Sequence, residues 1–174
     1  MRFLSRRGFV LLSAAGLVAL GPARGATPAP LPSFKADQVR VLKSQRVLEL
    51  RQNGAALKSY IIALGSHPRG PKRRYGDGRT PEGRYLVDGR TTHTPYHRAL
   101  HISYPNFMDT ARARAAGASP GGGIFIHGMP NRYGHFDPVR FFIDWTDGCI
   151  AVGNIAIEEI WAAVDDGTPI DILP

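Results

Sequence analysis

Alternating apolar and polar residues recur along most of the chain and predict short β-strands. The segment 39–50 combines this alternation with β-branched residues and is typical of one strand. Asn53-Gly54 then predicts a tight turn, so residues 57–64 should return beside the first strand as a β-hairpin. Further strands are predicted at residues 83–87, 99–104, 123–127 and 168–173.

Two segments carry helical signals instead. Pro105 precedes a helical stretch over residues 106–116, and Gly117 is typical of a helix C-terminus. Asn154 is a candidate N-cap for a second helix over residues 155–164. The apolar face of that helix should consist of residues spaced i, i+3, i+4 and i+7, namely Ile157, Ile160, Trp161 and Val164. The pattern predicts a mainly β protein, a mixed sheet or barrel-like β-sandwich decorated by two short helices.

Residues 1–25 predict an export signal rather than part of the fold. Basic residues, among them Arg6 and Arg7, precede an apolar run over 9–20 that is too short to span a bilayer comfortably. The small residues Ala23 and Gly25 occupy the −3 and −1 positions of a plausible signal-peptide cleavage site after Gly25. The surroundings of Arg6-Arg7 are typical of a twin-arginine signal, which the export machinery reads. An ordinary signal peptide and an uncleaved anchor are the alternatives.

Composition and charge indicate a single folded domain and restrict the kinds of partner that the protein could bind. Proline-rich residues 26–37 predict an extended tether, so residues 38–174 should form one domain. Hydrophobic residues make up 43% and charged residues 21% of the chain, which excludes a wholly disordered protein. The four arginines of the signal supply half of the formal net charge of +8. The exported protein is therefore mildly basic, which favours an acidic partner such as the cell wall, and export argues against nucleic acid.

Cys149 is the only cysteine, which excludes an intramolecular disulfide framework and a cysteine-rich zinc site. Proteins of oxidising compartments tend to pair their cysteines or lack them, so an unpaired one needs an explanation. The polar, glycine-containing segment 144–148 precedes Cys149 and predicts an accessible turn, where a thiol can react. A catalytic thiol is one interpretation, and a buried structural thiol or an intermolecular disulfide are the others.

A thiol nucleophile needs a base. The candidates are His67, His93 and His97 in predicted loops, where solvated side chains are expected, His101 and His127 in predicted strands, and His135. His127 stands out because it ends a strand and precedes Gly128, so rigid backbone would hold its imidazole. A structural histidine is the alternative. The spacing of the histidines does not suggest a metal site, and we expect no metal and no cofactor.

The residues around both groups resemble the signature of L,D-transpeptidase (YkuD-type) catalytic domains. The matching motifs are Ile126-His127-Gly128 and Thr146-Asp147-Gly148-Cys149-Ile150. The resemblance extends through segments 65–72, 76–83, 102–106 and 120–122, and it covers nearly all of residues 38–173. It implies a β-sandwich-like, mostly antiparallel fold with the cysteine in a cleft under a lid.

The resemblance also implies a role for each site residue. Cys149 would be the nucleophile, and His127 would be its base and later the proton donor. The residues expected to shape the turn or to bind the oxyanion are Thr146, Asp147, Gly148 and Gly128, with the N–H of Cys149. Those expected to contact substrate are Arg69, Lys72, Arg73, Arg74, His101 and Tyr104. The cations of segment 69–74 would attract the carboxylates of peptidoglycan stem peptides, with a solvated loop as the alternative.

The implied reaction is acyl transfer in the periplasm or cell envelope. The thiolate would attack the amide between the L-centre of a diamino acid and D-alanine in a stem tetrapeptide, and the amine of another stem would resolve the thioester as a cross-link. Segment 146–151 also resembles members of the family that cleave this kind of linkage with water, so a hydrolase is the second interpretation. A non-catalytic wall-binding domain is the third. Oligomeric state is not indicated.

Overall fold

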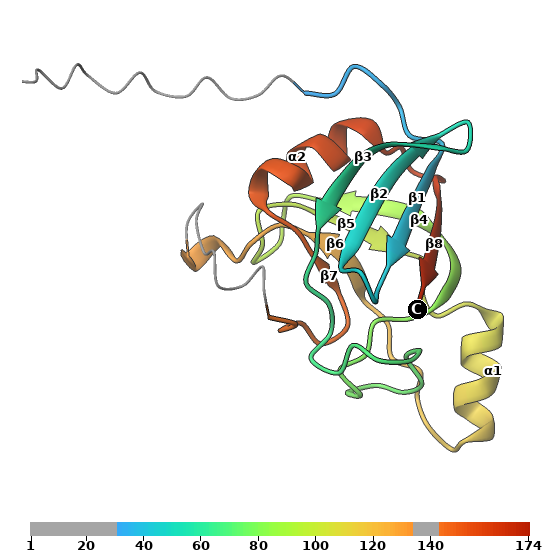
Figure 1. Cartoon of the computed structure of the whole chain (residues 1–174). Helices are drawn as coiled ribbons and strands as arrows, with labels where there is room; N and C mark the ends of the chain where they lie inside the picture. The colour runs from blue at the N-terminus through green and yellow to red at the C-terminus, as the bar shows by residue number, and fades with distance from the viewer. Residues whose placement is uncertain (1–30, 134–142) are drawn as a thin grey trace, which may run out of the picture.

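The computed structural model of the chain describes residues 31–133 and 143–174 (Figure 1). The predicted export signal, the start of the tether and His135 lie outside the described residues. No helix in the described part is long and apolar enough to cross a bilayer.

Eight strands form one curled sheet in the order β3-β2-β1-β8-β4-β5-β6-β7 (Figure 1). The strands are β1 (Gln38–Leu42), β2 (Val47–Gln52), β3 (Ala55–Ile61), β4 (Gly83–Thr91), β5 (Ala99–Ile102), β6 (Ile124–His127), β7 (Ile150–Ala151) and β8 (Pro169–Leu173). β1 runs parallel to β8 and β6 parallel to β7, while the other neighbours are antiparallel. The helices are α1 (Phe107–Ala115) and α2 (Asn154–Ala163). The prediction of a mainly β fold with a mixed sheet and two short helices is confirmed.

The predicted single strand over 39–50 is wrong, because the chain turns between β1 and β2. Arg46 adopts a left-handed φ of 56°, and its guanidinium binds Asp144 with Nη2 at 2.7 Å from Oδ2. Lys43 of the same turn is buried. Four consecutive polar residues, from Lys43 to Arg46, interrupt the alternation at this turn, and the prediction of one strand did not take that break into account. The contact that stabilises the turn involves a residue far away in the sequence.

The hairpin predicted at Asn53-Gly54 is confirmed. These residues have φ angles of 52° and 80°, and both are the positive values that a two-residue hairpin turn of this kind requires. β2 and β3 pair on either side of the turn, with Gln52 opposite Ala55. Glycine at the second position adopts this conformation without steric cost.

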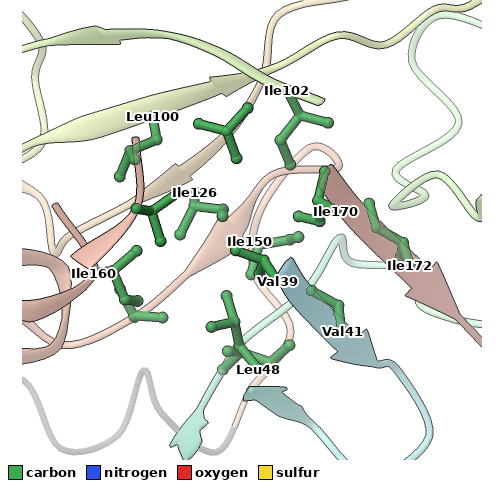
Figure 2. Packing of buried hydrophobic residues seen from close by; sticks show 14 of the residues in the cluster. Val39, Val41, Leu48, Leu100, Ile102, Ile126, Ile150, Ile160, Ile170 and Ile172 are labelled. Atoms are coloured by element: carbon green, nitrogen blue, oxygen red, sulfur yellow. The ribbon is translucent and has the colours of Figure 1, made fainter. Parts of the chain in front are cut away.

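Helix α2 packs its apolar face on the sheet. Ile157, Ile160 and Val164 are fully buried, and Ile160 lies among strand residues in the core shown in Figure 2. Trp161 of the predicted face is only half-buried, because it lies between the guanidinium groups of Arg90 and Arg98, at 5.0 and 4.9 Å from its ring centroid.

Asn154 is not the N-cap predicted for α2. The cap residue is Gly153, and the Asn154 side chain instead accepts the N–H of Met129 at 2.8 Å. The predicted first helix is confirmed as α1, and Asn106 caps it through a capping box with Asp109. The Asn154 contact ties the start of α2 to the loop that follows β6.

Candidate active site

Strands β6 and β7 bring His127 and Cys149 together. The two strands lie side by side and parallel, with Ile126 opposite Ile150, and Cys149 immediately precedes β7. The Cys149 Sγ lies 3.6 Å from the carbonyl oxygen of Gly123, the residue before β6. A strand end therefore positions the imidazole, and the turn entering the neighbouring strand positions the thiol.

The His127 imidazole has a defined tautomer. It is 1% exposed, and its Nδ1 lies 2.7 Å from the carbonyl oxygen of Gly128. A carbonyl only accepts hydrogen bonds, so Nδ1 carries the proton and Nε2 is left as a proton acceptor. Burial lowers the pKa of His127 to about 4, although the bond to Gly128 acts in the opposite direction. The imidazole is therefore neutral at neutral pH.

Aromatic rings enclose this imidazole. Tyr96 stacks on His127 with ring centroids 3.9 Å apart, and Trp145 meets it edge-on with centroids 5.7 Å apart. The stacked Tyr96 ring covers one face of the imidazole and contributes to the burial that lowers its pKa.

The Cys149 thiol is protonated in the resting site. Burial raises its pKa, and the negative charge of Asp147 raises it further. A backbone hydrogen bond from Phe125 and the positive charge of Lys72 act in the opposite direction but do not outweigh the burial. The resting site thus holds a neutral thiol and a neutral imidazole, a pair suited to proton transfer when substrate binds rather than a preformed ion pair.

Thr146 organises the turn before the thiol. Its Oγ1 donates to the carbonyl oxygen of Cys149 at 2.7 Å and accepts the N–H of Gly148 at 3.1 Å. Gly148 has a φ of 133°, and an added Cβ would lie 2.6 Å from the carbonyl oxygen of Arg79. Only glycine fits this position without strain. The Gly148 N–H expected to bind an oxyanion is thus hydrogen-bonded to Thr146 in this structure.

Two cavities meet at Cys149. The first, of about 350 Å³, is bordered by Thr91, His93, Thr94, Pro95, Tyr96, Ala99, Gly123, Phe125, His127 and Cys149. The second, of about 360 Å³, is bordered by Lys72, Tyr75, Gly76, Gly122, Gly123, Ile124, Asp147 and Cys149. The first contains the base and the aromatic rings of Tyr96 and Phe125, whereas the second contains the opposite charges of Lys72 and Asp147. A substrate can therefore reach the sulfur from two sides.

Of the four cations predicted to contact substrate, Lys72 borders the second of these two cavities, and the other three border neither of them. Arg69 borders a different cavity, of about 420 Å³, together with Lys43 and Glu82. Arg73 and Arg74 have exposed side chains, and their backbone N–H groups donate to the carboxylate of Asp77. The sequence groups these cations in one loop, and the fold directs them to different places.

His101 and Tyr104 border neither of the two cavities at Cys149. His101 Nδ1 lies 2.6 Å from Asp88 Oδ1, and its ring meets the edge of Phe125. Tyr104 is 3% exposed and its hydroxyl donates to the carbonyl oxygen of Pro120 at 3.0 Å. The geometry of Tyr104 is that of a residue that holds the 120–123 wall in place rather than one that contacts substrate.

The sequence interpretation missed several residues of the site. Tyr96, Phe125 and Tyr75 border the cavities but lie in no recognisable motif. His93 also borders the first cavity, although its loop position predicted only a solvated side chain. His97, expected to be solvated too, is half-buried with Nε2 2.5 Å from Glu158 Oε1. In the described segments, no group of three or more histidine, cysteine or acidic side chains converges as metal ligands would.

Comparison with known proteins gives a consistent match. The family model for the L,D-transpeptidase catalytic domain matches residues 36–172. A relative from Escherichia coli (strain K12) named "Putative L,D-transpeptidase YafK" is 34% identical over 135 residues, which is 72% of this chain and 46% of the relative. The chain thus spans just under half the length of this relative.

Solved structures agree with this match. Pgp2 from Campylobacter jejuni, described as a helical cell shape determining protein, is 27% identical with a TM-score of 0.60, over 78% of this chain and 46% of that chain. Bd1075 from Bdellovibrio bacteriovorus is 25% identical with a TM-score of 0.57, over 81% and 49%. An L,D-transpeptidase from Mycobacterium smegmatis, 14% identical with a TM-score of 0.52 over 79% and 58%, shares the fold.

Proposed function

Since the chain belongs to the L,D-transpeptidase catalytic domain family, we propose that it is an exported cysteine acyltransferase that acts on the stem peptides of peptidoglycan. One observation carries the proposal. The bond from Nδ1 to Gly128 leaves Nε2 of a neutral, buried imidazole as the proton acceptor, while His127 and Cys149 border one cavity. This arrangement contains a nucleophile, a base in the required tautomer and room for an acyl group.

The first half-reaction forms a thioester. Cys149 gives its proton to His127, and the sulfur attacks the amide carbon between the L-centre of a diamino acid and D-alanine. When the tetrahedral intermediate collapses, His127 gives that proton to the nitrogen of the departing D-alanine. The amine of a second stem peptide then resolves the thioester and forms a cross-link.

Backbone N–H groups at the turn would stabilise the oxyanion. We assign this role to the N–H of Cys149 and Asp147, and to Gly148 once its N–H exchanges Thr146 for the substrate oxygen. A single donor of this kind contributes about 3 kcal/mol to transition-state stabilisation. Thr146 therefore sets the geometry of the turn and holds one donor until substrate arrives.

The proposal is tested by incubating the purified protein with disaccharide-tetrapeptides and following the products by mass spectrometry. We expect release of D-alanine and a thioester adduct on the peptide that contains Cys149. Cys149→Ala should give neither, and it should also lose labelling by a carbapenem while keeping its circular dichroism spectrum. His127→Asn should slow acylation by about 10²–10⁴-fold. Retained labelling of Cys149→Ala would show that another residue is the nucleophile.

Hydrolysis is a second candidate outcome at the same site. The neutral His127 can take a proton from water as well as from an amine. Adding a free D-amino acid to the incubation separates the outcomes. An exchanged tetrapeptide indicates transfer, whereas free tripeptide alone indicates hydrolysis.

Export is part of the proposal. Residues 1–25 fused to a reporter should direct it to the periplasm or cell envelope, and replacing Arg6 and Arg7 together with lysine should abolish export by a twin-arginine route. Export that survives this replacement would indicate an ordinary signal peptide.

A further inference from the structure

The second cavity at Cys149 carries opposite charges. Lys72, Asp147 and Cys149 all border this space of about 360 Å³. The Lys72 side chain is only 3% exposed, whereas Asp147 lies exposed at the surface. Burying a charge is costly unless partner groups compensate for the lost water. A buried lysine beside the nucleophile therefore needs an explanation.

Lys43, the other buried lysine, shows what a structural lysine looks like in this protein. Its Nζ has three acceptors: Gly70 O at 2.8 Å, Thr80 O at 3.0 Å and Glu82 Oε1 at 2.8 Å. All three donors of Lys43 are thus used inside the protein. Within residues 31–133 and 143–174, Lys72 Nζ reaches one acceptor, Asp77 Oδ1 at 2.8 Å. Two donors of Lys72 remain for a ligand in the cavity.

Asp77 holds Lys72 in place but does not neutralise it fully. Its carboxylate also accepts the backbone N–H groups of Arg73, Arg74 and Arg79 at 2.7, 3.1 and 3.1 Å. Burial alone would raise the pKa of Asp77, but Lys72 and these N–H groups outweigh it and lower the pKa to about 2. Because the negative charge is shared among four donors, the ammonium of Lys72 keeps positive potential for a second anion.

We propose that this cavity is the subsite for the α-amino acid that leaves the stem peptide and for the amine that replaces it. Such a molecule carries a carboxylate and an amine on one carbon. Lys72 pairs with the carboxylate, and Asp147 faces the amine beside the sulfur. This inference rests on the function proposed above and names the residues that select its second substrate.

The two halves of the reaction support one shared subsite. Transfer of the acyl group to free D-alanine is the reverse of acylation, so the entering and leaving amines occupy the same position next to the sulfur. An entering ammonium first loses a proton, for which the Asp147 carboxylate is the acceptor in this cavity. The nitrogen then forms the C–N bond as the C–S bond breaks, and its second proton passes through His127 to the sulfur and restores the Cys149 thiol.

The test compares D-alanine with D-alaninamide as acceptors, because the amide lacks the carboxylate that Lys72 would bind. The protein is acylated with a stem tetrapeptide, and exchange is followed by mass spectrometry. We expect the KM for D-alanine to be at least tenfold lower than that for D-alaninamide. If water alone resolves the thioester, the same tenfold preference should appear when the two amines are compared as inhibitors.

Two variants locate the preference. Lys72→Gln should raise the KM for D-alanine at least tenfold and leave that for D-alaninamide unchanged, whereas Asp147→Asn should raise both. Lys35→Gln and Asp165→Asn are the matched controls, because they remove the same charges from an exposed ion pair that borders neither cavity at Cys149. Both control variants should have the same KM values for D-alanine and D-alaninamide as the unchanged protein.

The outcomes separate this inference from the proposed function. Failure of the unchanged protein to form an acyl-enzyme contradicts the proposed function itself. An acyl-enzyme that does not distinguish the two amines overturns the subsite alone. If Lys72→Gln does not fold, the comparison of amines on the unchanged protein and on Asp147→Asn still decides the question.

Discussion

Lowering the pH from 7 to 4 should destabilise the protein through His127. The imidazole is 1% exposed and stacked on Tyr96, and burial lowers its pKa from 6.5 to about 4. Between these two values the unfolded chain binds a proton at His127 that the folded protein does not. Protonation therefore favours the unfolded state throughout this range.

The magnitude follows from the size of the shift. One pKa unit corresponds to about 1.4 kcal/mol, so a pKa of about 4 instead of 6.5 gives about 3 kcal/mol of stability. This contribution is complete above pH 6.5 and is lost progressively as the pH falls towards 4. Asp77 does not interfere with this measurement. Its pKa is lowered from 3.8 to about 2, so the stability that its carboxylate contributes is lost below pH 3.8, outside the range from 4 to 7.

Urea unfolding measured at half-unit steps between pH 4 and 7 tests this prediction. His127→Asn removes the titrating group but keeps a side-chain N–H at the position of Nδ1, so the bond to Gly128 can persist. The unchanged protein should lose about 3 kcal/mol more than this variant across the range. His67→Gln, which removes an exposed histidine, should behave like the unchanged protein.

Parallel stability curves for the unchanged protein and His127→Asn would refute the reasoning. They would mean that the imidazole titrates alike in the folded and unfolded states, so it would be neither desolvated nor fixed in its neutral form. An NMR titration of the His127 ring gives an independent measurement, with an expected midpoint near 4 rather than 6.5.

Three further predictions concern the turn and the core. Gly148→Ala should lower the free energy of unfolding by about 2–4 kcal/mol, because the alanine Cβ would lie 2.6 Å from the carbonyl oxygen of Arg79 and the backbone φ is positive. The rate of alkylation of Cys149 should show whether the thiol has moved. Thr146→Val removes the hydroxyl that accepts the Gly148 N–H and should cost about 1–3 kcal/mol in chemical denaturation, with Thr146→Ser restoring most of it. Ile160→Ala should cost about 2–5 kcal/mol without changing the pH dependence of thiol alkylation, since this side chain is fully buried and borders neither cavity at Cys149.

Local chemistry explains which parts of the fold were predictable. Asn53-Gly54 forms its hairpin because asparagine and glycine adopt positive φ angles at lower cost than other residues. The apolar spacing along α2 predicted burial of Ile157 and Ile160, since helix geometry alone puts them on one face. In the same way, the apolar strand that ends at His127 and the polar turn before Cys149 marked both groups as candidates before any contact was known.

Contacts between distant residues explain where prediction failed. The turn at Arg46 depends on Asp144, and the side chain of Asn154 binds the N–H of Met129 instead of capping its own helix. Neither partner can be inferred from neighbouring residues. The two parallel pairings, β1 with β8 and β6 with β7, likewise join segments that no local pattern relates.

The sequence by itself determined the strand-rich fold, the family resemblance and the two candidate groups of the reaction, because residue type and spacing act through neighbours along the chain. Only the tertiary structure decided the protonation states and the use of each cation. Lys72 lies buried beside Cys149 while Arg69 borders another cavity, although three positions separate them in one loop. Burial and charge proximity arise from packing in three dimensions, and these two quantities set a pKa and select a ligand.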